Sequence, residues 1–120
     1  MKYLSLDPGF SHTGIAISHE GQLAEPLSTI HEKDNEKLLQ NIKELLKAQN
    51  PDIIVIGIPH HGPMVEISEN LSKNISVFFS GEIILHPEDL SSSRAKKLKS
   101  KHSDHALAAA FLLQDYLDSI

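Results

Sequence analysis

The chain contains no cysteine and no tryptophan, and its apolar runs are short. Without cysteine, disulfide bonds, thiolate catalysis and cysteine-based zinc sites are excluded. No apolar run approaches the roughly 20 residues that a membrane-spanning helix needs, and a strand pattern begins directly after the first residues, without a signal peptide. We therefore expect a cytoplasmic protein that has no membrane partner.

A length of 120 residues matches one domain, residues 1–120, with one hydrophobic core. The net charge of -5 argues against a generally basic nucleic-acid-binding protein. The basic residues are nevertheless unevenly distributed, because five of the 11 lysines and arginines fall close together. Such a cluster is most often a solvated helix face, so its position relative to other features decides its meaning. Its members are Arg94, Lys96, Lys97, Lys99 and Lys101.

Residues 2–18 form the most informative stretch. Two short alternating apolar runs flank a turn that begins at Asp7 and is closed by Thr13 and Gly14, which predicts a β-hairpin. Asp7 then lies at the end of a strand, and Gly9 and Gly14 leave space beside its carboxylate. Such a corner suits a metal ion or a phosphate, although Asp-Pro-Gly is also ordinary turn chemistry.

The remaining pattern predicts an α/β fold. Three antiparallel strands are followed by two parallel strands, with helices on both faces of a mixed five-stranded sheet. Pro26 deletes a ladder donor, so its strand should lie at an edge of the sheet. The predicted elements are an extended segment 22–31, a helix capped by Asp34 or Asn35 and stopped by Asn50-Pro51, a strand 52–58, a helix from Pro63 to Ser80-Gly81, a strand 82–86 ended by Pro87, a basic helix or turn after Ser91 to Ser93, and a last helix capped by Ser103.

Three acidic residues should meet at one edge of this sheet. Sites in open α/β sheets form beyond the carboxyl ends of the parallel strands, where Asp7, Glu88 and the start of the last helix with Asp104 are expected. Converging carboxylates repel one another, and a divalent cation relieves that repulsion and activates water. Oxygen ligands suit Mg²⁺ or Mn²⁺. Taken singly, Glu88 is equally typical of a solvated loop, and Asp104 of a residue that complements a helix dipole.

The basic cluster lies between Glu88 and Asp104 in the sequence. At that position it could bind a phosphate backbone. The placement of the cluster therefore favours a nucleic-acid partner more than its size does.

Four segments, LSLDPGFSHTGIAIS, DIIVIGIPHHG, ILHPEDLSSSRA and DHALAAAFLLQDYL, together resemble the YqgF-like branch of the RuvC-type Holliday junction resolvases, the family of the pre-16S rRNA nucleases. The resemblance covers nearly the whole chain. It implies a ribonuclease H-like fold and two-metal hydrolysis of phosphodiester bonds in pre-16S rRNA or in Holliday junctions. It also implies that Asp7, Glu88 and Asp104 are the catalytic and metal-binding residues. The acid that RuvC resolvases carry on their fourth strand would fall near Gly57, so the YqgF-like branch fits better.

Three departures from the family pattern leave alternatives open. The usual Asp-Glu-Arg motif is Pro-Glu-Asp at residues 87–89, and Ser11 and His12 replace basic residues. Alignment on LLQDYL places His105, rather than Asp104, at the last acid, so His105 is the alternative metal ligand. The alternative function is a catalytically weakened nucleic-acid-binding module. An RNA or a branched DNA substrate, and a monomer or a homodimer, are both compatible with the sequence.

Overall fold

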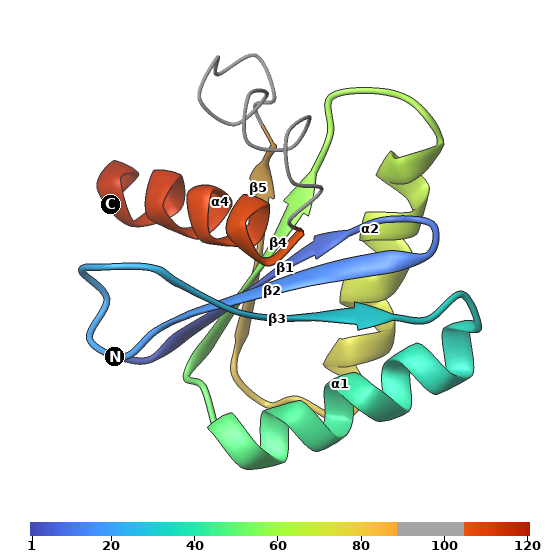
Figure 1. Cartoon of the computed structure of the whole chain (residues 1–120), viewed down its shortest axis with the longest axis horizontal. Coiled ribbons are helices and arrows are strands. Elements are labelled where there is room, and N and C mark those ends of the chain that lie inside the picture. Colours follow the sequence, from blue (N-terminus) through green and yellow to red (C-terminus); the bar gives the residue numbers. More distant parts are fainter. Residues whose placement is uncertain (89–104) are drawn as a thin grey trace.

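The computed structural model describes residues 1–88 and 105–120 (Figure 1). The predicted order of elements is confirmed within these ranges. The basic segment predicted after Ser91 to Ser93 and the predicted cap Ser103 lie outside the described residues. The elements are β1 (Tyr3–Pro8), β2 (His12–Ser18), β3 (Glu25–His31), α1 (Asn35–Gln49), β4 (Ile53–Ile58), α2 (Pro63–Ser76), β5 (Glu82–Pro87) and α4 (His105–Ser119).

The five strands form one sheet in the order β3-β2-β1-β4-β5. β1 pairs antiparallel with β2, and β2 antiparallel with β3, whereas β4 lies parallel to both β1 and β5. This arrangement confirms the mixed sheet expected from the sequence. It also places the ends of β1, β4 and β5 at one edge, which we call the carboxyl edge.

β3 is an edge strand, as Pro26 predicts, but it is shorter than expected because it begins at Glu25. Its pairing with β2 shifts next to the proline: Ala16 lies opposite Pro26, whereas Ile15 lies opposite Ser28. Leu27 is left out of the register, as in a β-bulge. A proline has no amide hydrogen to donate, so an irregular edge is where a sheet can accommodate it.

The helix ends follow from local chemistry. The Asp34 side chain accepts hydrogen bonds from the amides of Glu36 and Lys37 at the start of α1, and Asn50 ends the helix in the left-handed conformation. α2 ends earlier than predicted, at Ser76 rather than before Ser80. The amide of Phe78 bonds to the carbonyl of Ile75 at 3.1 Å, so the chain leaves the helix through a tightened turn.

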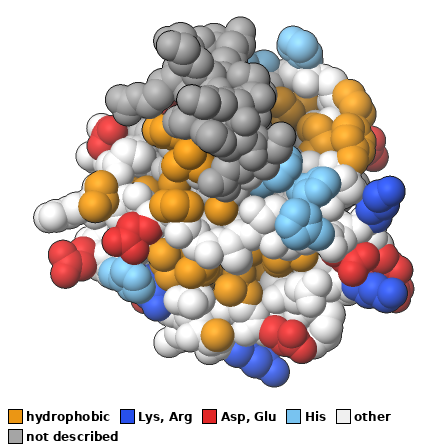
Figure 2. Space-filling model, in the orientation of Figure 1, with side chains coloured by type: hydrophobic (Ala, Val, Ile, Leu, Met, Phe, Trp, Pro, Cys, Tyr) orange, Lys and Arg blue, Asp and Glu red, His pale blue; other side chains and the backbone are white. Residues whose placement is uncertain are grey.

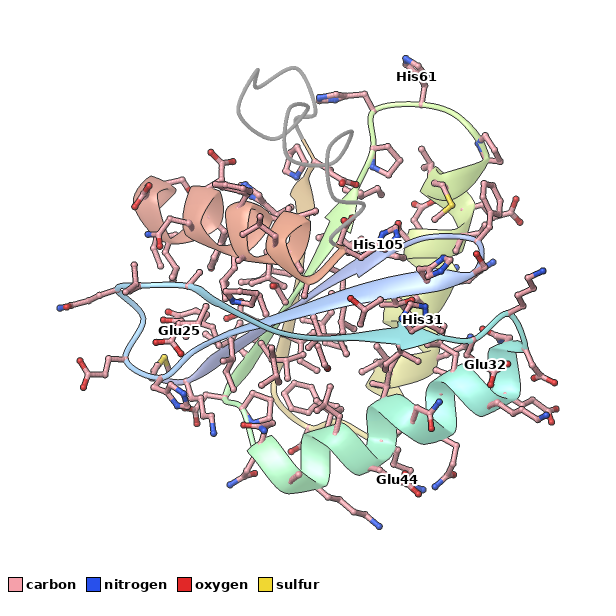
Figure 3. All side chains as sticks on the ribbon, in the orientation of Figure 1. Glu25, His31, Glu32, Glu44, His61 and His105 are labelled. Carbon is pink, nitrogen blue, oxygen red and sulfur yellow. The ribbon has the colours of Figure 1, made fainter. Side chains whose placement is uncertain are left out.

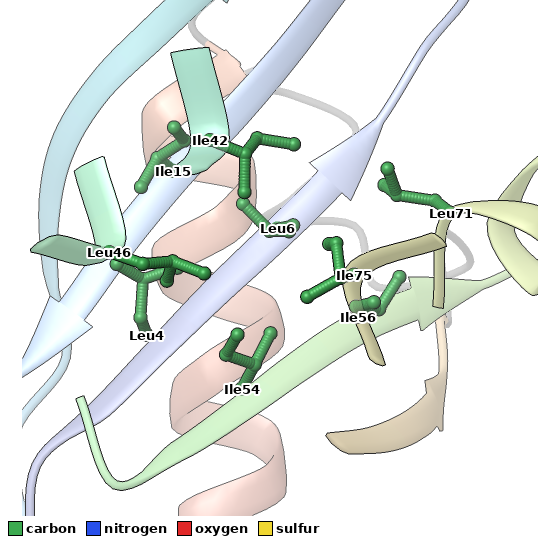
Figure 4. Close-up of a cluster of buried hydrophobic side chains, with 9 residues drawn as sticks. All are labelled: Leu4, Leu6, Ile15, Ile42, Leu46, Ile54, Ile56, Leu71 and Ile75. Atoms are coloured by element: carbon green, nitrogen blue, oxygen red, sulfur yellow. The ribbon is translucent and has the colours of Figure 1, made fainter. Parts of the chain in front are cut away.

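Helices cover both faces of the sheet, as predicted. α1 and α2 pack on one face, which we call the α1/α2 face, and α4 packs on the opposite face, the α4 face. Leu4 and Leu6 of β1 point to the α1/α2 face, whereas Tyr3 points to the α4 face, because side chains alternate along a strand. Figure 4 shows the aliphatic cluster of the α1/α2 face, formed by Leu4, Leu6, Ile15, Ile42, Leu46, Ile54, Ile56, Leu71 and Ile75. Within the described ranges, no helix has the length and apolar character needed to cross a membrane.

Candidate active site at the carboxyl edge

Asp7 lies near the end of β1, directly opposite Gly14 of β2. Its position in the strand alternation, two residues after Ser5, directs its side chain to the α4 face. Ser5 itself donates a hydrogen bond of 2.8 Å to the backbone carbonyl of Ala109 in α4. The Asp7 side chain is nearly buried, with 4% of its surface exposed. The structure thus has the predicted carboxylate at the end of a strand. This carboxylate lies beneath α4, the last helix that the sequence predicted.

Gly14 allows α4 to begin directly above this strand pair. A Cβ atom at Gly14 would overlap the backbone carbonyl of His105, the first residue of α4. Gly9 has a related role in the turn, because a Cβ there would lie 2.6 Å from the carbonyl oxygen of His12. Real Cβ atoms do not approach this closely, so both positions require glycine for a close backbone approach. Thr13, the third residue predicted to support the turn, is buried.

Glu88 reaches the same face from the end of β5. Its amide donates a 2.8 Å hydrogen bond to the carbonyl of Ile58, which ties it to the end of β4. A Cβ at Gly57 of β4 would lie 3.7 Å from Oε2 of Glu88 and 2.9 Å from the Leu112 side chain. A side chain at position 57 would therefore point to the α4 face, against Leu112 and beside the Glu88 carboxylate.

Asp7 and Glu88 lie near each other at this edge. Leu6 pairs with Ile56, so Asp7 and Gly57 follow side by side on neighbouring strands, which run about 4.8 Å apart. The Glu88 carboxylate lies beside Gly57, the residue of β4 that neighbours Asp7. Two of the three predicted acids are thus brought together on the α4 face.

The other predicted site residues have different outcomes. Asp104 and the basic residues Arg94, Lys96, Lys97, Lys99 and Lys101 lie outside the described residues. Within residues 1–88 and 105–120, no three His, Asp or Glu side chains are arranged to hold a metal ion.

His105 belongs to a group of three neighbouring imidazoles, which sequence reasoning missed. Its ring lies parallel to that of His12, with centroids 4.7 Å apart, and His12 meets the ring of His31 edge-on, also at 4.7 Å. The cross-strand pairing of His12 with His31 brings two of the rings together. Figure 2 shows histidine side chains gathered on the visible side of the molecule, and His31 and His105 are labelled in Figure 3. Ser11 Oγ lies 2.8 Å from Nδ1 of His12.

A second set of interacting side chains joins α4 to β5. Nε2 of His86 lies 2.8 Å from Oδ2 of Asp115, and the His86 ring meets the Tyr116 ring edge-on at 5.5 Å. Burial raises the pKa of the Tyr116 hydroxyl above its ordinary value, and the nearby Tyr3 and Glu82 raise it further. These groups fix α4 against the sheet away from the two carboxylates.

A pocket of about 440 Å³ lies at the opposite edge of the sheet. It is bounded by the C-terminal part of α1 and by the segment between α2 and β5, with Lys43, Phe78 and Gly81 among its lining residues. Its walls include the segments that lead into β4 and β5, so the pocket is separated from Asp7 and Glu88 by the length of the strands.

The sheet order and the helices on both faces define a protein with a ribonuclease H-like fold. The fold matches RuvC from Thermus thermophilus with a TM-score of 0.66 and 12% sequence identity, over 99% of this chain and 95% of that one. It also matches the fowlpox virus Holliday junction resolvase with a TM-score of 0.64 and 15% identity, over the whole of both chains. At these identities, the likeness establishes the fold.

Sequence comparison establishes the family. The family model described as "RuvX: Holliday junction resolvase" matches residues 1–119, and the chain belongs to this family. A relative from Dehalococcoides mccartyi, named "Putative pre-16S rRNA nuclease", is 35% identical over 88% of this chain and 89% of its own length. A relative of the same name from Bacillus cytotoxicus is 33% identical over 99% of both chains. The resemblance seen in the four sequence segments is therefore confirmed, and the family's names denote nucleases.

Proposed function

We propose that this protein is a metal-dependent endonuclease that hydrolyses phosphodiester bonds in structured nucleic acid. The observation that carries the proposal is the convergence of Asp7 and Glu88 on the α4 face of the carboxyl edge. Membership of a family whose relatives are named as pre-16S rRNA nucleases and Holliday junction resolvases supports this assignment. One similar structure is that of T. thermophilus RuvC in complex with a Holliday junction, which supports a nucleic-acid partner.

The two carboxylates fit a hard divalent cation. Asp7 and Glu88 would supply oxygen donors, which Mg²⁺ and Mn²⁺ prefer. We propose Asp104 as the third acid, because it directly precedes α4, whereas the ring of His105 is stacked on His12. A bound divalent cation would polarise a phosphoryl oxygen and lower the pKa of water at the site. The protein's own contribution is to hold both acids on rigid strand ends, where the packing of α4 fixes their positions.

Cleavage assays with matched acid variants test the proposal. The substrates are a labelled four-way DNA junction and a precursor fragment of 16S rRNA, each incubated with Mn²⁺, Mg²⁺ or EDTA. We expect wild-type cleavage with a metal and none with EDTA. Asp7→Asn and Glu88→Gln should each lower the rate by roughly 100- to 1000-fold, since each weakens binding of the divalent cation that would stabilise the negatively charged transition state. The substrate that is cleaved distinguishes RNA processing from junction resolution.

Two controls make the outcome specific. Glu69→Gln changes an exposed acid on α2, on the other side of the sheet, and should cleave at the wild-type rate. Mn²⁺ should raise the melting temperature of the wild type but not that of Asp7→Asn, because a ligand that binds the folded state stabilises it. Full activity of Asp7→Asn with either metal would contradict the proposed site.

A catalytically weakened nucleic-acid-binding module is the second candidate. Its support is Pro87, which replaces the first acid of the family's usual motif and lies within β5, paired with Ile58. Such a module would bind the same substrates in a salt-dependent manner without cleaving them. Metal-dependent turnover by the wild type would eliminate this candidate.

A further inference from the structure

Phe10 is an exposed aromatic residue at the carboxyl edge. The chain has four phenylalanines. Phe78, Phe79 and Phe111 are half-buried, whereas 67% of the Phe10 surface is exposed in the loop that joins β1 to β2. A large apolar ring left in water forgoes the stabilisation that burial would give, and it remains available to contact a ligand.

The loop presents this ring in a constrained way. Only Gly9, Phe10 and Ser11 separate β1 from β2, and the approach of Gly9 to the carbonyl of His12 keeps the turn tight. A phenylalanine has two side-chain torsions, so holding its ring against a ligand costs little conformational entropy. The ring is therefore suited to contact a ligand that arrives at the edge.

The ring is also close to the candidate active site. Phe10 follows Asp7 by three residues, and a chain segment of that length spans at most about 11 Å between Cα atoms. Successive stacked nucleotides rise about 3.4 Å along one strand. A base that contacts Phe10 thus belongs to a nucleotide within about three positions of a phosphate held at Asp7.

We propose that Phe10 stacks on an unpaired nucleobase of the substrate, beside the phosphate that Asp7 and Glu88 hold. The inference rests on the proposed nuclease function and assigns to it a contact with bases. Phenylalanine rings stack on splayed-out bases without hydrogen-bond readout, because every base offers a π-face. This contact is largely insensitive to sequence. It differs from phosphate binding because it does not depend on charge.

The first test measures binding without cleavage. Labelled single-stranded oligonucleotides and a four-way junction are titrated with the full chain in EDTA. Phe10→Ala and Phe10→Leu should weaken binding by roughly 5- to 150-fold, the range that corresponds to loss of one stacked base. Phe10→Tyr keeps the ring and should bind as the wild type does. Equal affinity of Phe10→Leu and wild type would overturn the proposal, because it would show that an aromatic ring is not needed.

The second test identifies the contact with a fluorescent reporter. Because the chain lacks tryptophan, Phe10→Trp introduces a single tryptophan at the site. Stacking of a base should change its emission on titration with the oligonucleotide, at every protein concentration tested. Val77→Trp is the matched control, because Val77 is 85% exposed at the far end of α2. An emission change that follows protein concentration but not oligonucleotide would overturn the proposal and assign Phe10 to self-association.

A third test locates the base. A single abasic position is moved along the oligonucleotide, and the loss of affinity is compared between the wild type and Phe10→Ala. We expect one abasic position, within about three nucleotides of the cleaved bond, to weaken binding by the wild type but not by Phe10→Ala. Loss of affinity at the same positions in both proteins would overturn the proposal.

Parallel cleavage assays in Mn²⁺ distinguish the stacking role of Phe10 from the proposed nuclease function. Cleavage by the wild type together with unchanged binding by Phe10→Ala would refute the stacking role and leave the nuclease standing. Phe10-dependent binding without any cleavage would support stacking and refute the nuclease. If the wild type binds neither nucleic acid, both claims are refuted.

Discussion

The two faces of the sheet are packed in different ways. On the α1/α2 face, large aliphatic side chains such as Leu6, Ile54 and Ile75 interdigitate (Figure 4). On the α4 face, small residues such as Ala16 and Ala109 let the helix backbone approach the strands closely. The first face stabilises the fold through side-chain volume. The α4 face has smaller side chains, and its helix lies closer to the strands. The two described acids of the candidate site, Asp7 and Glu88, lie on this face.

The first prediction compares a change of one methyl group on each face. Gly14→Ala adds a methyl group where the carbonyl of His105 already lies. A backbone carbonyl cannot rotate away as a side chain can, so the start of α4 has to move. We expect a loss of about 3 kcal/mol in the free energy of unfolding, the upper part of the range for overpacked sites. Urea denaturation measures it.

The matched change on the α1/α2 face removes one methyl group. Ile56→Val should cost about 0.5–1.5 kcal/mol, because Ile56 is fully buried among aliphatic neighbours. Gly14→Ala should also lower cleavage, whereas Ile56→Val should not. A smaller loss of stability for Gly14→Ala than for Ile56→Val would show that the close approach of α4 does not limit the α4 face.

The second prediction compares one substitution on the two faces. Ser5→Ala removes the 2.8 Å hydrogen bond to the carbonyl of Ala109, which joins β1 to α4. We expect a loss of about 1 kcal/mol in the free energy of unfolding, a typical value for a buried hydrogen bond. The measurement is again urea denaturation.

Ser68→Ala is the counterpart in α2. The Ser68 hydroxyl is buried and has no hydrogen-bond partner within the described part of the chain. Removing a buried polar group that lacks a partner relieves its desolvation cost, so the variant should be as stable as the wild type or more stable. Destabilisation of Ser68→Ala comparable to that of Ser5→Ala would contradict this difference between the two hydroxyls.

The sequence was sufficient to predict the topology and the positions of Asp7 and Glu88 at the ends of strands because these signals are local. The apolar run from Ile53 to Ile58 indicates a strand covered on both faces, and Asp7 and Glu88 directly follow apolar strand residues. The end of a strand is a property of the segment itself. Because β1, β4 and β5 run parallel, their carboxyl ends lie at the same edge of the sheet.

The group of three histidines and the need for glycine at position 14 could not be predicted in the same way. His12, His31 and His105 are far apart in the sequence, and their contact depends on the register of β2 with β3 and on where α4 begins. A shift of one residue in either would separate the rings. One signal was available: His12 and His31 lie at opposite ends of the segment that forms β2 and β3.

The third prediction concerns the far end of the α4 face and has the smallest effect near neutral pH. Burial, with Tyr3 and Glu82 nearby, raises the pKa of Tyr116 in the folded state. Below the unfolded pKa of about 10, the hydroxyl is protonated in both states and stability does not depend on it. Between the unfolded and the raised folded pKa, the unfolded chain loses this proton and the folded chain keeps it. The free energy of unfolding should therefore fall as the pH rises through this window.

Tyr116→Phe provides the control because it keeps the ring that packs against Tyr3 and His86. Its stability, measured by urea denaturation at a series of alkaline pH values, should fall less steeply than that of the wild type. Tyrosinate absorbance of the folded wild type should likewise show one group that titrates late. If both proteins lost stability in parallel, Tyr116 would be ionising as freely in the folded chain as in the unfolded one. The close packing of α4 would then exclude water near Gly14 and Ser5 but not at this end of the helix.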